Sequence, residues 1–141
     1  MKMKKGTLMV VVDQRIVDES ELILENDFIS LRLIRDRDLP WFVLVPKIEG
    51  ATELIDLDER EQGLLLIEIN KVSRCLREQF KVDKINIGII GNMVRQLHIH
   101  IVGRFESDRH FPRTIWGNRL DISAIDPLFV ERMRQCSILS Q

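Results

Sequence analysis

Hydrophobic residues recur at a helical spacing through the middle of the chain. The apolar positions are Leu65, Ile69, Val72 and Leu76. This spacing places apolar side chains on one face of an α-helix. Asp58 and Glu61 match an N-cap and its capping-box partner. The pattern therefore predicts one long helix that begins after Asp58 and ends near Phe80.

Four other segments have the alternation, or the density of β-branched and aromatic residues, that is typical of strands. They are residues 28–34, 41–45, 84–90 and 96–104. A charged stretch ending at Pro40 separates the first two segments, which predicts an antiparallel hairpin. The Gly91-Asn92 pair forms a turn before the last segment. A hairpin, a long helix and two further strands predict an α+β protein with an antiparallel meander.

The two ends of the chain carry weaker signals. Apolar residues 8–12 follow several lysines, as at the start of a signal peptide, but Asp13 ends the run too early for an h-region. We therefore expect a short strand or an extended arm there, and a second, shorter helix within residues 127–139. No repeat or linker divides residues 1–141, and no stretch is long enough for a membrane span. The sequence predicts one single domain.

Composition and charge change this picture mainly by exclusion. The net charge of -1 and the pI of about 6.3 leave no basic excess of the kind that nucleic-acid and anionic-membrane binders carry. We expect neither nucleic acid nor a membrane as a partner, whereas a phosphorylated small molecule needs only a local site. Cys75 and Cys136 are too far apart in sequence for a paired-cysteine metal motif or a disulfide framework. They are expected to be reduced thiols in a cytoplasmic protein.

The most distinctive chemistry lies on the last predicted strand. Gln96, His98 and His100 are alternate residues, so their side chains are expected on one face of that strand. The intervening residues, Leu97, Ile99 and Ile101, then face a hydrophobic core. Alternate residues of a strand stand roughly 6.5–7 Å apart, so both imidazoles can reach one bound group.

Three interpretations of the histidine pair remain open at this point. The alternation of His98 and His100 can be incidental to a surface or core strand. The pair can also bind a metal ion, which requires a third ligand. The only other histidine is His110, and the spacing singles out no carboxylate to complete the shell.

The third interpretation is nucleophilic catalysis at a phosphorus centre. An imidazole is a competent nucleophile near neutral pH, because much of it is unprotonated there. A neighbouring imidazole or amide can orient it and handle protons. Negative charge develops on the phosphoryl oxygens and needs hydrogen-bond donors. The preceding turn, Gly91-Asn92-Met93-Val94, can supply backbone N–H groups and the Asn92 amide.

Residues 91–102 resemble the signature of the histidine triad (HIT) family, His-φ-His-φ-His-φ-φ, where φ is apolar, on a strand that follows a glycine-containing turn. The apolar run 41–47 resembles the family's proline-capped upstream strand, and the long helix between the two also matches. The resemblance is strongest to a bacterial branch described as diadenosine-tetraphosphate-hydrolase-like. This branch has Gln-φ-His-φ-His in place of the full triad, a preceding Gly-Asn turn and a downstream Trp-Gly, here Trp116-Gly117.

The resemblance implies a HIT-like fold, a nucleotide substrate and a homodimer, and the residues themselves demand no metal or other cofactor. It implies cleavage at the α-phosphate of dinucleoside polyphosphates or nucleoside phosphoramidates, through a nucleotidyl-histidine intermediate on His98. His100 would support the nucleophile, and Gln96 occupies the position of the first histidine. The positions implied in phosphate binding are Asn86, Gly91, Asn92, Met93 and Val94.

Three residues depart from the family pattern. Gln96 replaces a histidine, and an amide can donate and accept hydrogen bonds but cannot carry charge. Trp41 stands where many members have another histidine, and Met93 stands where many have serine or threonine. These departures motivate an alternative function, a nucleotide-binding module with little or no hydrolysis.

Overall fold

The computed structural model describes residues 10–36, 39–117 and 127–140. Its centre is a five-stranded antiparallel sheet in the order β1-β2-β3-β5-β4. The strands are β1 (Ser20–Glu25), β2 (Ile29–Ile34), β3 (Trp41–Pro46), β4 (Lys84–Gly88) and β5 (Ile99–Arg104). The helices are α1 (Gln14–Asp18), α2 (Glu59–Gln79) and α3 (Pro127–Arg134), with 3-10 turns at Leu54–Asp56 and Ser137–Ser140. The predicted α+β class is confirmed.

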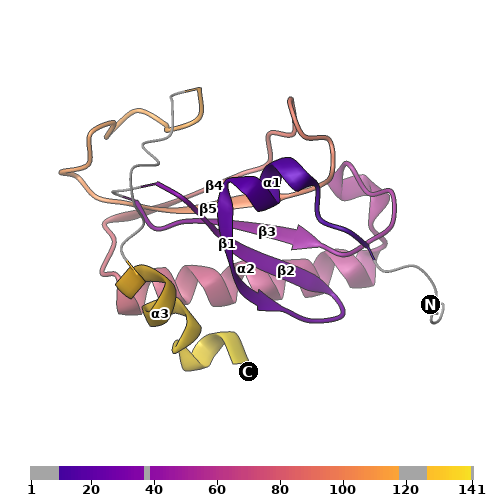
Figure 1. The fold of residues 1–141 in the computed structure, drawn as a ribbon, viewed down its shortest axis with the longest axis horizontal. Coiled ribbons are helices and arrows are strands. Elements are labelled where there is room, and N and C mark those ends of the chain that lie inside the picture. Colours follow the sequence, from indigo (N-terminus) through magenta and orange to yellow (C-terminus); the bar gives the residue numbers. More distant parts are fainter. Residues whose placement is uncertain (1–9, 37–38, 118–126, 141) are drawn as a thin grey trace.

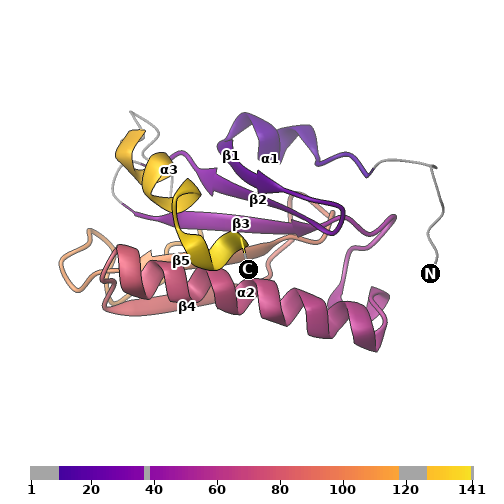
Figure 2. The same ribbon diagram turned by 90° about the horizontal axis from the view of Figure 1, so that it is seen from below.

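The sheet lies between α1 on one side and α2 on the other (Figures 1 and 2). The chain does not wind as a simple meander, because α2 carries it past the sheet and β4 takes the outer edge before β5 returns beside β3. No helix in the described part of the chain is long and apolar enough to cross a membrane.

The long predicted helix is present with the predicted start. Asp58 accepts a hydrogen bond from the backbone N–H of Glu61, and the Glu61 side chain accepts one from the backbone N–H of Asp58. This capping box satisfies backbone donors that the first turn of a helix leaves without partners. The predicted apolar stripe is buried: Leu65, Ile69, Val72 and Leu76. Periodicity and capping are local properties, which is why the sequence revealed this element.

Alternation along the strands divides the sheet into two faces. On the helix face, aliphatic and aromatic side chains pack beneath α2; these strand residues include Leu31, Leu33, Phe42, Leu44, Ile99 and Ile101. On the opposite face, which we call the histidine face, lie Arg32, Ile34, Trp41, Val43, His98, His100 and Val102. Leu97, Ile99 and Ile101 are each at most 1% exposed, so their predicted core position is confirmed.

Two strands are shorter than the sequence predicts. The strand predicted to continue to Ile90 ends at Gly88, and the chain then turns through Gly91, whose φ is 68°. The strand predicted from Gln96 begins at Ile99, opposite Leu44 of β3. Its partner β3 ends at Pro46, and proline has no N–H to extend a ladder.

Two elements near the N-terminus were not predicted. α1 is a five-residue helix capped by Asp13, and β1 pairs with β2. The apolar residues of β1 do not alternate strictly, because a register shift lies between Leu22 and Leu24. Residues 10–13 form no strand, and residues 8 and 9 of the predicted strand or arm lie outside the described residues.

The C-terminal segment corrects the prediction for the two cysteines. α3 and the turn after it pack Met133, Cys136 and Leu139 into the helix-face core. Cys136 is joined to Cys75 of α2 by a disulfide across 61 residues of sequence, with a Cα–Cα distance of 6.4 Å. The expectation of two reduced thiols is therefore wrong. Sequence spacing could not reveal the pairing, because only the packing of the C-terminal segment against α2 brings the two residues together.

Candidate active site

His98 and His100 lie side by side on the histidine face, as the alternation predicts. Their side chains are 7% and 9% exposed, and their ring centroids are 5.0 Å apart in an edge-to-face arrangement. The rings are therefore closer than the spacing of alternate residues along a strand requires. His98 immediately precedes β5, and His100 is its second residue.

A backbone carbonyl orients the His98 ring. His98 Nδ1 lies 2.7 Å from the carbonyl oxygen of Gln96. A carbonyl oxygen only accepts hydrogen bonds, so Nδ1 carries the proton in this pair. The neutral ring then has its lone pair on Nε2, and a nucleophilic nitrogen needs such a lone pair.

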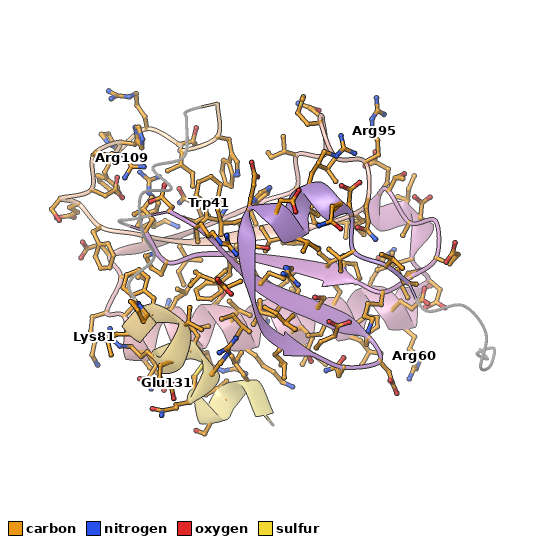
Figure 3. All side chains as sticks on the ribbon, in the orientation of Figure 1. Trp41, Arg60, Lys81, Arg95, Arg109 and Glu131 are labelled. Carbon is orange, nitrogen blue, oxygen red and sulfur yellow. A yellow bond between two sulfur atoms is a disulfide. The ribbon has the colours of Figure 1, made fainter. Side chains whose placement is uncertain are left out.

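A tryptophan contacts the second imidazole. The Trp41 indole Nε1 donates a hydrogen bond to Nδ1 of His100 across 3.0 Å, and both side chains are buried. In the view of Figure 3, Trp41 is labelled towards the middle of the molecule, whereas Arg95 and Arg109 are labelled near its outline. Burial, and to a smaller extent the charge of His98, lower the pKa of His100 to about 4. His100 is therefore uncharged at neutral pH.

A second tryptophan, Trp116, also contacts the His100 ring. The Trp116 and His100 rings are 5.7 Å apart. Gly88 faces His100 across the β4–β5 pair, and a Cβ at this position would approach the Trp116 ring to 2.9 Å. The absence of a side chain at Gly88 therefore gives Trp116 its place over the histidine face. The buried Trp116 Nε1 has no hydrogen-bond partner in the described structure.

The loop that carries Trp116 is held by a buried ion pair. Arg104, 1% exposed, makes two hydrogen bonds of 2.9 Å to the Asp108 carboxylate. Burial alone would raise the pKa of Asp108, but hydrogen bonds from Arg104 and from the loop backbone outweigh it and hold the pKa well below its usual range. Arg104 also donates to Asn86 Oδ1 at 2.9 Å. The side-chain oxygen of Asn86, which was predicted to bind phosphate, therefore bonds to Arg104 and helps to hold the loop.

The side chain of Gln96 engages the N-terminal segment. Its Oε1 accepts from the backbone N–H of Asp13 at 2.7 Å, and its Nε2 donates to the carbonyl of Val11 at 3.0 Å. Arg15 adds a bond of 3.1 Å to the carbonyl of Met93. Residues 11–15 therefore lie along the turn before the histidines, and Val12 joins the apolar cluster of the histidine face. Sequence reasoning missed this segment as part of the site, since its only local signal was Asp13 ahead of a short helix.

The turn between β4 and β5 has the features expected of an anion-binding loop. Gly91 has a positive φ, and Asn92 and Met93 are exposed. Within the described residues, the backbone N–H groups of Asn92, Met93 and Val94 donate no hydrogen bond, so they are available to a ligand. Val94 is half-buried against the cluster that contains Trp41.

The described residues contain no cluster of side chains that would support the metal-binding interpretation. No group of three or more histidine, cysteine, aspartate or glutamate side chains suited to a metal ion occurs in the part of the chain that the structure describes. His110, the third ligand considered from the sequence, lies in the loop after β5, where its backbone N–H donates to Asp108.

Comparison with known proteins gives a family for this arrangement. The family model described as the HIT domain matches residues 15–107, more than half of the chain. The search of curated proteins finds no match.

Several solved structures are similar over most of their length. A histidine triad protein from Bradyrhizobium japonicum is 35% identical with a TM-score of 0.85, and the match covers 92% of this chain and 98% of that one. One from Sinorhizobium meliloti 1021 is 31% identical with a TM-score of 0.81, covering 90% and 96%. One from Marinobacter aquaeolei VT8 is 32% identical with a TM-score of 0.75, covering 79% and 81%.

Proposed function

Because the chain belongs to the histidine triad family, we propose that it is a nucleotide hydrolase or nucleotidyl transferase. Its substrates would be dinucleoside polyphosphates or nucleoside phosphoramidates, as in the diadenosine-tetraphosphate-hydrolase-like branch that the Gln-x-His-x-His motif resembles. The observation that carries the proposal is the hydrogen bond from His98 Nδ1 to the Gln96 carbonyl, which leaves Nε2 with the lone pair.

The reaction would proceed in two displacements at the α-phosphorus. The lone pair of His98 Nε2 attacks phosphorus, and the bond to the leaving group breaks with its electron pair remaining on that group. Water then attacks the same phosphorus and releases a proton to the solvent. The phosphorus–nitrogen bond breaks, and its electron pair returns to His98. Splitting the reaction in this way is the general advantage of a covalent nucleophile.

The surrounding residues supply hydrogen-bond donors for the phosphoryl oxygens. The turn formed by Gly91, Asn92, Met93 and Val94 offers backbone N–H groups without partners in the described structure. His100 stands next to the nucleophile as an uncharged ring. Preorganised donors of this kind stabilise charge that develops in the transition state. Gln96 would contribute by holding residues 11–13 beside His98, and Asn86 by supporting Arg104.

One observation favours a second candidate, a nucleotide-binding module with little or no hydrolysis. The amide of Gln96 is bonded to the backbone of Val11 and Asp13, so this position offers no proton carrier to the site. Such a module would bind a nucleoside monophosphate without forming an adduct.

A single-turnover experiment separates the two candidates. Wild-type protein and His98→Ala would be mixed with diadenosine tetraphosphate and with adenosine 5′-phosphoramidate, and acid-quenched samples would be analysed by intact mass. An adenylyl adduct and AMP release in the wild type, both absent from His98→Ala, would support the enzyme. Full turnover by His98→Ala would refute the mechanism. Nucleotide-dependent thermal stabilisation without an adduct would support the binding module. His110→Ala is the matched control, because it removes the histidine that lies outside the pair.

We also propose that the chain acts as a homodimer. Exposed apolar residues on the edge strand β4 and in the turn that follows it support an interface between two copies: Ile87, Ile89, Ile90 and Met93 are 51%, 37%, 43% and 82% exposed. Edge strands with uncovered apolar residues readily pair with another chain. Light scattering coupled to gel filtration would test this. An Ile87→Lys variant should shift the mass to that of the monomer, and an unchanged dimer mass would argue against this edge.

A further inference from the structure

The hydrogen bond between Trp41 and His100 determines where His100 carries its proton. An indole N–H is a donor and has no acceptor atom. Since Trp41 Nε1 lies 3.0 Å from His100 Nδ1, that nitrogen must present its lone pair. The neutral ring then has its hydrogen on Nε2. Protonating Nδ1 would set two N–H groups against each other in a buried contact, where losing a hydrogen bond is costly.

The packing around the pair keeps both rings in this arrangement. Trp41 is 7% exposed and belongs to the apolar cluster with Val43 and Val102. Trp116 also packs against the His100 ring, edge to face. The residues that β3 and β4 pair with His100, Val43 and Gly88, carry no charge.

The two imidazoles of the site are therefore in opposite tautomers. His98 has its proton on Nδ1 and its lone pair on Nε2, because its partner is a carbonyl. His100 has its lone pair on Nδ1 and its proton on Nε2, because its partner is an indole. The sequence presents two equivalent histidines, whereas the structure leaves the lone pair on Nε2 in one ring and on Nδ1 in the other.

We propose that Trp41 is a positioning residue that fixes His100 as a permanently neutral Nε2–H donor, so that the site favours leaving groups that depart without a proton. The second half of this statement rests on the proposed function. His100 can donate a hydrogen bond to a phosphoryl oxygen, but it cannot take up a proton and pass it on.

Other groups near the histidines do not replace this lost proton carrier. His98 uses its free nitrogen as the nucleophile. Asp13 lies close enough to interact with the charge of His98, but the Arg15 guanidinium bonded to its carboxylate lowers its pKa, so it stays ionised. Gln96 does not titrate. No proton donor for a departing group is therefore found in this described neighbourhood.

This arrangement distinguishes the two proposed substrate classes by their leaving groups. In a polyphosphate, the P–O bond breaks and the electron pair remains on a phosphate oxygen as stable negative charge. In a phosphoramidate, the P–N bond breaks and the nitrogen must receive a proton, since an amide anion is too basic to leave. Because general acid catalysis contributes typically about 10²–10⁴-fold, the site should favour the anhydride by about 100-fold or more in kcat/KM.

Nitrogen NMR of the histidine rings tests the role of Trp41 without any substrate. In the wild type, His100 should show an unprotonated Nδ1 and a protonated Nε2 from pH 6 to pH 8. Trp41→Phe should lose this tautomer preference. Trp116→Phe is the matched control, because it makes the ring packed against His100 smaller but removes no hydrogen bond from that ring, and it should keep the preference. A wild-type His100 protonated on Nδ1, or charged at pH 6, would overturn the proposal whatever the activity.

A paired-substrate assay tests the consequence for chemistry. The ratio of kcat/KM for diadenosine tetraphosphate to that for adenosine 5′-phosphoramidate should be large in the wild type. It should fall at least about tenfold in Trp41→His, whose imidazole can accept as well as donate and so allows His100 to bind a proton. Equal rates on both substrates in the wild type would overturn the leaving-group preference. Failure to cleave either substrate would count against the proposed function and this preference together, while the NMR result would still decide the role of Trp41.

Discussion

The two faces of the sheet bury different kinds of side chain. The core on the helix face, beneath α2, consists of apolar residues and the half-cystines Cys75 and Cys136. The buried polar and charged residues of the described chain gather instead on the histidine face and its turns. They are Ser20, Ser30, Arg32, Asp36, His98, His100 and Arg104. The helix face supplies stability through non-directional packing, whereas the histidine face depends on named donor–acceptor pairs.

The comparison implies that stability and chemistry can be perturbed separately. A change on the helix face should lower the free energy of unfolding without altering the histidine rings. A change on the histidine face should alter both, because the residues that hold this face together also position the imidazoles.

The largest effect on stability is expected from Arg104→Met. This substitution leaves the Asp108 carboxylate, 3% exposed, without its guanidinium partner. Breaking a buried pair from one side costs about 3–5 kcal/mol of unfolding free energy. Urea unfolding would measure the loss. Arg15→Met is the control, because the side chain of Arg15 is 62% exposed in its pair with Asp13, and such pairs contribute about 0–1 kcal/mol. A loss below about 1 kcal/mol for Arg104→Met would show that the buried pair contributes no more than the exposed pair.

Removing the disulfide should be the strongest perturbation of the helix face. Replacing Cys75 and Cys136 together by alanine opens a loop of 61 residues, and the chain-entropy relation gives a loss of about 4 kcal/mol. Denaturant unfolding with and without reductant measures this loss, and reductant should leave the double variant unaffected. The His98 and His100 nitrogen shifts should stay as in the wild type. A shift in either ring would show that the two faces are coupled.

A pH effect of intermediate size is expected from His100. Its pKa is about 4 in the folded protein and 6.5 in the unfolded reference. Below pH 6.5 the unfolded chain therefore binds more protons at this residue, so stability falls as the pH drops from 6.5 towards 4. The total loss over this window is about 3 kcal/mol. Urea midpoints from pH 7.5 to pH 4.5 would show the slope. His100→Gln should flatten it, and an equally steep slope in this variant would assign the effect to other groups.

The smallest effect is expected from Gln96→His, which restores the histidine of the full triad. An imidazole cannot reproduce both bonds that the Gln96 amide makes to Asp13 and Val11. Losing them should cost about 1–2 kcal/mol and speed amide hydrogen exchange in residues 11–15. Gln96→Glu is the matched variant, because it keeps an acceptor for the Asp13 N–H, whereas a carboxylate oxygen replaces the donor to the Val11 carbonyl. Unchanged exchange in Gln96→His would show that this side chain does not hold the segment.

The parts of the fold that the sequence predicted are those with local signals. A capping box and a helical spacing of apolar residues indicate α2, and alternation of apolar and polar residues indicates the strands that bury both faces. The sequence did not predict β1, because the register shift between Leu22 and Leu24 interrupts its alternation. The sequence did not predict the disulfide, because its two cysteines come together only when the C-terminal segment packs on α2.

The candidate site divides in the same way. That His98 and His100 share one face follows from the two-residue period of a strand, and the sequence contained it. The partners of the site side chains come from distant segments: Trp41 for His100, Asp13 for Gln96 and Asp108 for Arg104. A hydrogen bond between β3 and β5 depends on their register, which no local pattern specifies.

The sequence by itself therefore determined α2, the strands β2 to β5, their apolar core and the pair of histidines, because these depend on periods of two and 3.6 residues along one chain. Only the tertiary structure decided which tautomer each histidine adopts. A carbonyl against His98 and an indole against His100 assign the two protons to opposite nitrogens. The proton position of an imidazole is set by the group that faces it, and folding alone brings that group into contact.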